Sequence, residues 1–476
     1  MNAIPMMEAN VKFNSIKTAR RWLIAIMLAH SASAFALTFN IPISSLTNHN
    51  TSAHPAYNES LCPANFGTSS WISPDGATIA VDPAQTDLSL NSVTPAHVSR
   101  MNVHSLIPKR PDLRWFAHLC PWFGSSLHMK IGLINNSTAY VASMIEDMKR
   151  RGFDGVVIDW WGQGGANRTD EVTQKIKSYL ASQPGNQFTY IVSIDKGVKG
   201  GLAPANLERQ IQYCQSEYFS DPNYEREPVR TGQPILMFFG VRSKIGEPDM
   251  IQIKSACGGN MVWVEQGTTH LSEPWEDGCF VWADDFKHGV NPQDQFNLSA
   301  VTRDISAMGR SGKKAFGAMC AQFNGTLTKK VGWSMGKYVP SGSGLCLVER
   351  AAAINAAIPA NVTRMQWVTW NDWEEGSQVE GGIENNFALN PAVTSAGVLS
   401  WTVTSGDERT IDHYEIYASS DGVNAAYLGS VAAGTHQADV APFNLPKGSY
   451  QLYIDAVGKP CIRDHLSSPV GYLVSQ

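Results

Sequence analysis

Eight short apolar segments follow one another between residues 115 and 372, and they limit the fold more than any other feature of the chain. Each segment is rich in aliphatic, β-branched or aromatic residues and is typical of a buried strand. They occupy residues 115–123, 155–161, 189–195, 235–241, 261–267, 279–285, 315–323 and 365–372. Apolar strands of this kind, separated by helical segments, indicate a parallel sheet covered by helices. Eight such units in about 280 residues predict an α/β fold, a (β/α)8 barrel of the TIM type.

Helical periodicity between the strands supports this prediction. After the first strand Val141 and Ile145 fall on one helical face, and after the second strand Val172 and Ile176 do the same. Residues 267–278, between the fifth and sixth strands, are too few and too broken by turn residues to form a helix. The helix expected after the eighth strand is also not evident. A doubly wound open sheet therefore stays an alternative.

The chain divides into four parts by composition. Residues 1–36 place basic residues ahead of a short apolar run with small-residue cleavage sites, which predicts a secretory signal peptide; a retained membrane anchor is the alternative. Residues 37–105 are rich in Ser, Thr, Asn and Pro and predict a loosely structured N-terminal extension. The predicted barrel domain spans residues 106–390. Residues 393–476 alternate apolar and polar positions between turn clusters, which predicts a small all-β sandwich.

Net charge and cysteine content argue against several classes of function. The net charge of −5 gives no reason to expect binding to nucleic acid or to anionic membranes. None of the eight cysteines lies in a C-x-x-C motif, and no His/Cys cluster has metal-ligand spacing, so we expect neither a metal nor an organic cofactor. In an oxidising compartment some cysteines would pair, and Cys257 with Cys279 is the pair expected from their proximity in the sequence.

Carboxylates and tryptophans gather at the carboxyl ends of the predicted strands, where a (β/α)8 barrel carries its active site. Carboxylates accept hydrogen bonds from vicinal hydroxyls, and indole rings cover the apolar face of a sugar. The sequence therefore predicts a site for a polyhydroxylated ligand. The residues predicted to bind it are His118, Trp122, Asp159, Trp160, Asp195, Glu265, Asp284, Gln322, Trp370, Asn371 and Trp373. For the acids, a buried salt bridge or a loop cap is the alternative, and for the tryptophans a place in the core.

Asp372 and Glu375 are the predicted catalytic pair. Their i, i+3 spacing on the turn that leaves the eighth strand lets both carboxylates point into the barrel mouth. Glycosidic cleavage needs two such groups, one to protonate the leaving oxygen and one to act as base or nucleophile. The same spacing also fits a capping box, with Asp372 as the N-cap and Glu375 reaching back. Because the following residues do not continue as an amphipathic helix, we favour the catalytic interpretation.

A second segment of the sequence matches a known catalytic motif. Residues 332–336 match the G-x-S-x-G pattern of a serine esterase, with Ser334 as its nucleophile. That motif requires a buried strand before the serine and a helix after it. The flanking sequences TLTKKV and KYVPSGSG provide neither, so we regard the esterase as a weak alternative.

Three segments together resemble a known family. AHLCPWFG at 117–124, DMKRRGFDGVVIDWWG at 147–162 and TWNDWEEGSQVE at 369–380 resemble the endo-α-1,3-glucanases of glycoside hydrolase family 71 and the related endo-α-mannosidases and endo-mannanases of family 99. The likeness runs from about Leu106 to Asn386. The C-terminal part is similar to a fibronectin type III sandwich in the spacing of Trp401 and Tyr414.

This resemblance implies roles for the paired acids. Both families are (β/α)8 barrels that carry W-N-[DE]-x-x-E at the eighth strand, which falls here on Trp370, Asn371, Asp372 and Glu375. It implies that Glu375 is the general acid and Asp372 the base, which in the inverting family 71 activates water. Asp at the first acidic position, and the absence of the histidine that family 99 usually places between the two acids, favour family 71.

The sequence thus predicts an exported endo-acting hydrolase of α-linked polysaccharide, with α-1,3-glucan as the first candidate. An α-mannan hydrolase on the same scaffold is the nearest alternative. A non-catalytic carbohydrate-binding or adhesion protein is an alternative of another class. The expected partner is the polysaccharide, with no nucleic acid, no stable membrane insertion after removal of the signal, and a monomeric state.

Overall fold

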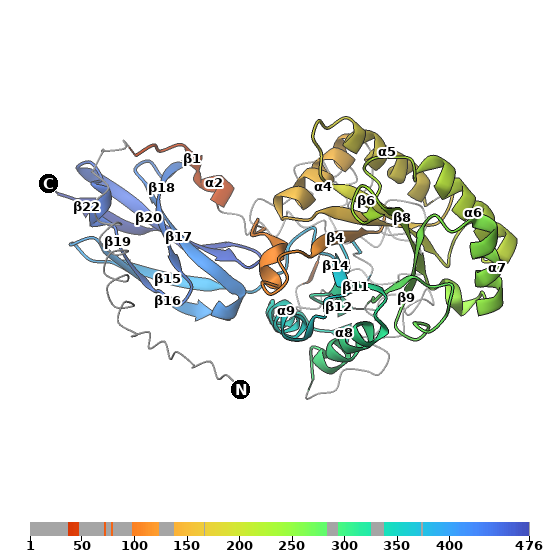
Figure 1. Ribbon diagram of the computed structural model, residues 1–476. Helices are drawn as coiled ribbons and strands as arrows, with labels where there is room; N and C mark the ends of the chain where they lie inside the picture. Colours follow the sequence, from red (N-terminus) through yellow and green to blue (C-terminus); the bar gives the residue numbers. More distant parts are fainter. Residues whose placement is uncertain are drawn as a thin grey trace, which may run out of the picture.

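The computed structural model describes residues 37–46, 71–72, 78–79, 98–122, 138–165, 167–282, 294–324, 338–372 and 375–475. The chain forms two lobes, a barrel and a β-sandwich, which are seen side by side in Figure 1. Within the described residues no helix is both long and apolar enough to cross a membrane. The predicted signal peptide at 1–36, and the predicted functional residues Asp284, Ser334 and Trp373, lie outside the described residues.

Eight parallel strands form a closed barrel, which confirms the predicted fold class. Each strand pairs in parallel with the next, and closure comes from pairing of the first strand with the last, where Met365 lies opposite Trp115. The strands are β4 (Arg114–Leu119), β5 (Gly155–Trp160), β6 (Thr189–Asp195), β8 (Gln233–Phe239), β9 (Val262–Gln266), β10 (Gly278–Phe280), β11 (Lys314–Met319) and β14 (Val362–Trp367). The alternative of an open, doubly wound sheet is therefore wrong.

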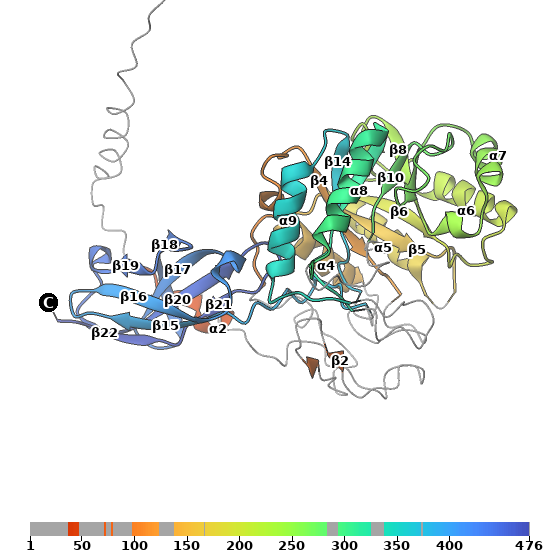
Figure 2. The same ribbon diagram turned by 90° about the horizontal axis from the view of Figure 1, so that it is seen from below.

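Within the described residues, six helices follow strands of the barrel and cover its outer face (Figure 2). They are α4 (Thr138–Arg150), α5 (Thr169–Ala181), α6 (Pro204–Glu217), α7 (Glu247–Cys257), α8 (Leu298–Ser311) and α9 (Leu345–Ala357). The two weak points of the sequence pattern correspond to real features. Residues 267–277 connect β9 to β10 through turns, and the chain after β14 runs through a loop into the sandwich.

Two apolar layers result from the alternation of side chains along each strand. Inside the barrel, residues such as Phe116, Val157 and Met237 fill the interior. Their neighbours in sequence face the helices, so that Trp115 and Val156 belong to a second and larger core. The direction of each side chain at the barrel mouth follows from the same alternation.

Short elements complete the barrel lobe. They are η3 (Val103–Leu106), β7 (Arg226–Glu227), η4 (Val241–Ser243), β12 (Phe323–Asn324) and β13 (Tyr338–Val339). Strands β2 (Trp71–Ile72) and β3 (Thr78–Ile79) pair antiparallel with each other.

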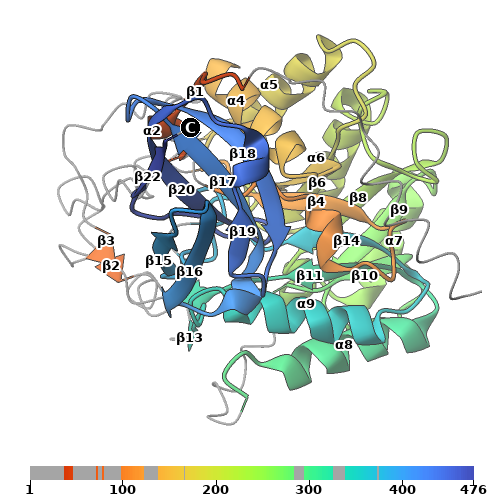
Figure 3. The ribbon, with the colours of Figure 1, turned by 90° about the vertical axis from the view of Figure 1, so that its left-hand side faces the viewer.

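The C-terminal lobe is a sandwich of two antiparallel sheets (Figure 3). One sheet contains β15 (Ala388–Val393), β16 (Val398–Ser405) and β19 (Gln437–Asp439). The other contains β17 (Ile411–Ser419), β18 (Asn424–Ala432), β20 (Gly448–Gly458), β21 (His465–Leu466) and β22 (Val470–Val474). Trp401, Tyr414 and Leu452 lie in the core between the sheets. The all-β sandwich is thus as predicted, while its similarity to fibronectin type III stays a prediction.

The described part of the N-terminal extension packs on the sandwich. Strand β1 (Ile41–Pro42) pairs antiparallel with β18, and helix α2 (Ile43–Leu46) follows it directly. Phe39 stacks on Tyr450, with 6.2 Å between the ring centroids. An N-terminal segment therefore belongs structurally to the C-terminal lobe.

The expected disulfide is wrong. Cys257 and Cys279 are both buried free thiols. Cys257 ends α7, and its thiol faces the Glu208 carbonyl of α6 at 3.9 Å, whereas Cys279 lies in β10 within the core. Proximity in sequence misled because α7 and β10 present these side chains to different neighbours.

Candidate active site

Three adjacent strands, β4, β5 and β6, bring three of the predicted residues together at the carboxyl end of the barrel. His118 lies in β4, Asp159 in β5 and Asp195 ends β6; all three are at most 4% exposed. His118 Nε2 lies 3.7 Å from Asp159 Oδ2. The predicted convergence of strand ends thus holds for these three side chains.

Gln366 of β14 sets the proton position on His118. The Gln366 side-chain nitrogen donates to the Val281 carbonyl at 2.6 Å, which leaves its oxygen to face His118 Nδ1 at 3.2 Å. That oxygen can only accept, so Nδ1 carries the proton. Burial lowers the pKa of His118 to about 4, and the ring is therefore neutral at pH 7. Its Nε2 lone pair is then directed toward the Asp159 side of the mouth.

Among the described residues, no lysine or arginine forms an ion pair with either of the two buried aspartates. Burial raises the pKa of Asp159 to about 8, although Trp161 Nε1 donates to its Oδ1 at 3.1 Å. Burial, and then the nearby charge of Asp159, raise the pKa of Asp195 well above its usual value, although the Gly197 amide donates to it. Carboxyl groups of this kind are protonated at neutral pH and donate a hydrogen bond. The prediction from the sequence considers these carboxyl groups only as hydrogen-bond acceptors.

A tryptophan pair forms an aromatic wall near these acids. The Trp122 and Trp161 rings lie 5.2 Å apart at an angle of 47°. Trp122 was predicted, but Trp161 was missed in favour of its neighbour Trp160. The strand period contained the signal, because Asp159 points into the mouth and residues two apart share a face.

Trp160 faces the helices instead. Its ring is fully buried and stacks on Tyr213 of α6 at 5.9 Å, and its Nε1 donates to Asp170 of α5 at 3.3 Å. Trp160 is therefore a core residue and cannot form a platform for a ligand in the mouth.

Glu265 on β9 likewise points away from the barrel mouth. Val264 fills the barrel interior, so the following side chain points outward, where Glu265 Oε1 accepts from the Arg242 amide at 3.4 Å. Burial raises the pKa of Glu265 well above its usual value. Alternation directs Gln266, which was not predicted, toward the mouth.

The other half of the mouth is aromatic. Trp282 follows β10 and lies edge-on to His118 at 4.5 Å, and Phe239, at the end of β8, lies 4.8 Å from Trp282. Neither ring was predicted. The predicted Gln322 is 3% exposed, beyond the end of β11, and its side-chain oxygen has no hydrogen-bond partner among the described residues. The mouth is therefore lined by both buried carboxyl groups and aromatic rings.

Trp370 and Asn371 support the mouth from behind. Trp370 is fully buried, with the Arg151 guanidinium 4.8 Å from its ring, so it lies away from the mouth. Asn371 makes two hydrogen bonds with the backbone of Cys120, at 2.8 and 3.0 Å. These bonds tie the exit of β14 to the exit of β4. Both residues hold the site together and are not placed to grip a ligand.

The predicted acids lie on the loop that leaves β14, referred to below as the acid-bearing loop (Thr369–Asp372 and Glu375–Glu380). Asp372 is 6% exposed, its Oδ1 accepts from the Glu375 amide at 2.9 Å, and the Cys120 thiol lies 3.8 Å from its Oδ2. Glu375 is half-buried. The hydrogen bond from the Glu375 amide is the first half of the capping box, which was the alternative to the catalytic interpretation. The next residues, however, form a turn and not a helix.

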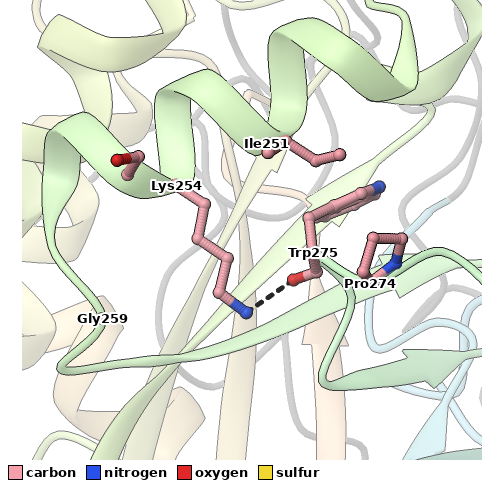
Figure 4. A pocket seen from close by; sticks show the side chains of 6 residues that line it. Ile251, Lys254, Gly259, Pro274 and Trp275 are labelled. Atoms are coloured by element: carbon pink, nitrogen blue, oxygen red, sulfur yellow. Dashed lines mark hydrogen bonds between the residues drawn. The ribbon is translucent and has the colours of Figure 1, made fainter.

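A cavity of about 340 Å³ lies away from this mouth, between α7 and the residues before β10 (Figure 4). Ile251, Pro274 and Trp275 line it, and Lys254 Nζ donates to the Trp275 carbonyl at 2.6 Å. The lysine also pairs with Asp277 at 2.7 Å, so its charge is already compensated. In the described part of the chain no three His, Cys, Asp or Glu side chains are grouped so as to hold a metal ion.

Comparison with known proteins gives only distant likenesses. No protein-family model matches the sequence, and no curated protein matches it either. Among solved structures, the family 99 endo-α-mannosidase from Bacteroides thetaiotaomicron, in complex with bis-tris-propane, is 14% identical, with a TM-score of 0.44 over 57% of this chain and 88% of that one. A second structure of that enzyme is 14% identical, with a TM-score of 0.40 over 56% of this chain and 75% of that one. A family 27 β-L-arabinopyranosidase from Geobacillus stearothermophilus is 10% identical, with a TM-score of 0.31 over 68% of this chain and 93% of that one.

Proposed function

We propose that this protein is an endo-acting glycoside hydrolase of α-linked polysaccharide, with α-1,3-glucan as its substrate. The observation that carries the proposal is the acid-bearing loop at the barrel mouth, where a buried Asp372 held by backbone contacts stands beside a half-buried Glu375. Inverting hydrolysis needs one carboxylate fixed to activate water and a second group that reaches the leaving oxygen.

Asp372 has the features of the base. Its own amide donates to Thr369 Oγ1 at 2.8 Å and its carboxylate accepts from the Glu375 amide, so both its backbone and its side chain are fixed. An N–H donor complements the negative charge that a base must carry before it takes a proton from water. Glu375 would protonate the glycosidic oxygen, and its greater exposure gives it access to a polymer that lies across the mouth.

The remaining mouth residues suit a sugar ring. Neutral Asp159 would donate to a hydroxyl, and His118 Nε2 would accept from one, so the pair can bind a hydroxyl in both of its hydrogen-bonding roles. Trp122 and Trp161 on one side, and Trp282 on the other, offer ring faces to the C–H groups of the sugar. Export directed by residues 1–36 completes the proposal, because a polysaccharide of this kind lies outside the cell.

The proposal is tested by measuring the release of reducing ends from insoluble α-1,3-glucan, α-1,6-mannan and starch by the wild type and by Glu375→Gln. We expect release from α-1,3-glucan and a fall of about 10³-fold in the variant, within the range for loss of a general acid. The matched control is Glu374→Gln, which removes the neighbouring acid and should leave turnover within about twofold if Glu375 is the proton donor.

Three other outcomes would change the proposal. Release from mannan alone would move the substrate to the alternative polymer. Binding to a polysaccharide without release would favour the carbohydrate-binding alternative. Activity that survives in Glu375→Gln and is lost in Glu374→Gln would reassign the acid.

A further inference from the structure

The two arms of the acid-bearing loop meet at a neck formed by Trp370, Val379 and Glu380. The Val379 and Glu380 amides both donate to the Trp370 carbonyl, at 3.0 and 2.9 Å. Beyond the neck the Ser377 amide donates to the Asp372 carbonyl at 3.1 Å. The position of Asp372 therefore depends on how firmly this neck is held.

Arg151 holds the neck from the barrel side. It follows α4, is 1% exposed, and its two terminal nitrogens donate to the Val379 carbonyl at 2.6 Å and the Glu380 carbonyl at 2.9 Å. Its guanidinium lies over the Trp370 ring, and it forms an ion pair with Asp147. One side chain thus contacts all three residues of the neck. A planar guanidinium suits this task, because it directs several donors in fixed directions.

The sandwich holds the chain just beyond the neck. The Ile383 amide donates to the Cys461 carbonyl at 2.8 Å, and the Arg463 amide donates to the Ile383 carbonyl at 3.0 Å. The Arg463 side chain donates to the Gly381 carbonyl at 3.1 Å and to Glu384 at 3.0 Å. This contact lies between the two lobes and includes main-chain bonds, so its geometry is closely defined.

Cys461 connects the two supports. Its backbone bonds Ile383, and its thiol is buried beside the Arg151 guanidinium, whose charge partly offsets the rise that burial causes in the pKa of Cys461, to about 11. The barrel arginine and the 461–463 segment of the sandwich therefore form one continuous support.

We propose that the C-terminal sandwich is part of the catalytic apparatus, because its 461–463 segment and Arg151 together position the acid-bearing loop. Arg151 and Arg463 act as positioning residues and touch no substrate. This inference rests on the proposed function for its catalytic consequence, whereas the support itself is a property of the fold. It differs from the two roles that an appended β-domain suggests by default, which are polysaccharide binding and spacing from a surface.

The test compares two arginines of the sandwich in the full chain. Arg463→Gln removes the contacts to Gly381 and Glu384. Arg409→Gln is the matched control, because Arg409 also reaches the barrel, at Glu349 of α9 with 3.2 Å between nitrogen and oxygen, and its ion-pair partners, Asp407 and Glu349, lie outside both the loop and residues 381–384 just beyond its neck. We expect kcat to fall about 10- to 100-fold in Arg463→Gln with KM within about twofold, since a displaced acid affects the chemical step more than binding. Arg409→Gln should match the wild type.

Hydrogen exchange of the Ser377, Val379 and Glu380 amides gives a readout that needs no turnover. These amides donate within the loop and at its neck, so loosening should speed their exchange about 10-fold or more in Arg463→Gln and not in Arg409→Gln. Equal exchange in the two variants would overturn the inference. Faster exchange with unchanged kcat would overturn it as well, because the support would then have no bearing on the acids.

A second pair tests the barrel side. Arg151→Lys keeps the charge but can reach only one of the two carbonyls, and Arg364→Lys changes a similarly buried arginine that pairs with Glu225 and Glu227 instead of the neck. Faster exchange at the neck in Arg151→Lys alone supports the inference, and equal exchange in both contradicts it. If the wild type cleaves none of the polysaccharides, the proposed function fails, and the exchange measurements still decide whether the sandwich holds the loop.

Discussion

The two ends of the barrel bury acids in opposite ways. At the amino ends of the strands Glu225 is fully buried, and it accepts from Arg114 at 3.1 Å, from Arg364 at 2.8 Å and from Thr189 at 2.7 Å. At the carboxyl ends Asp159 and Asp195 are almost as deeply buried, and no lysine or arginine in the part of the chain that the structure describes forms an ion pair with either. The first arrangement compensates a buried charge. The second keeps the acids neutral, and buried acids with raised pKa values are typical of functional sites.

The amino end should respond most strongly to loss of its acid. Glu225→Gln would remove the carboxylate that Arg114 and Arg364 share, leaving Arg364 paired with Glu227 and Arg114 at 3.9 Å from Asp154, and we expect a loss of about 3–5 kcal/mol in the free energy of unfolding. Urea unfolding at pH 7 measures it. A loss below about 1 kcal/mol would mean that this network does not stabilise the barrel.

Two adjacent tryptophans, Trp160 at the end of β5 and Trp161 just after it, should differ in the same way between stability and binding. Trp160→Ala should lower the free energy of unfolding by about 3–5 kcal/mol, because Trp160 is a fully buried core residue. Trp161→Ala should cost clearly less stability and instead raise KM for the polysaccharide about 10-fold, through loss of a stacking face. Urea unfolding and initial rates separate the two effects. The reverse pattern would mean that the alternation of β5 has been misassigned.

The carboxyl end should show its neutral acids in the dependence of stability on pH. The folded-state pKa of Asp159 is about 8, above the value near 3.9 of an unfolded chain, so between these values the folded protein binds a proton that the unfolded chain releases. Stability therefore falls as pH rises through this window, by about 1.4 kcal/mol per pH unit for this group. Asp159→Asn removes that contribution, so its stability relative to the wild type should increase from pH 5 to pH 8.

Unfolding by urea at several pH values tests this prediction. The control is Asp112→Asn: the surface pair with Arg110 lowers the pKa of Asp112, so this group is ionised in both states above pH 5, and its difference from the wild type should be small and constant from pH 5 to pH 8. A constant difference between Asp159→Asn and the wild type would show that Asp159 is ionised in the folded protein across the whole range.

A surface pair sets the lower limit of these effects. Glu171 and Lys175 of α5 form an i, i+4 ion pair at 2.6 Å, with the Glu171 side chain 49% exposed. Glu171→Gln should change the free energy of unfolding by less than about 0.5 kcal/mol, and the change should disappear at high salt. A change of more than 1 kcal/mol would remove the contrast with Glu225.

The sequence was sufficient for the barrel and only partly sufficient for its mouth. Long apolar runs recur at every barrel strand, so all eight strands were predictable from residue type alone. Side-chain direction depends on where each alternation begins, which explains why Trp160 and Glu265 were expected in the mouth while Trp161 was not. Gln366 was missed for another reason. Its role depends on a contact with His118, which is 248 residues away along the chain and next to it only after the barrel closes.

The capping alternative shows a different limit. Residue spacing allowed either a helix cap or a catalytic pair for Asp372 and Glu375. The structure contains the hydrogen bond from the Glu375 amide to Asp372 that a cap requires, and a catalytic loop would also need this bond to fix Asp372. One bond can serve both roles, so the pattern could not decide between them. A decision requires chemistry.

The most direct test of the central claim compares two substrates of Glu375→Gln. A polysaccharide has a poor leaving group and needs a proton from the enzyme, whereas a dinitrophenyl glycoside of the matching α-linked oligosaccharide leaves without one. If Glu375 is the general acid, kcat should fall about 10³-fold on the polysaccharide and less than about 10-fold on the activated glycoside. An equal fall on both substrates would contradict the account, because Glu375 would then support the site without donating the proton.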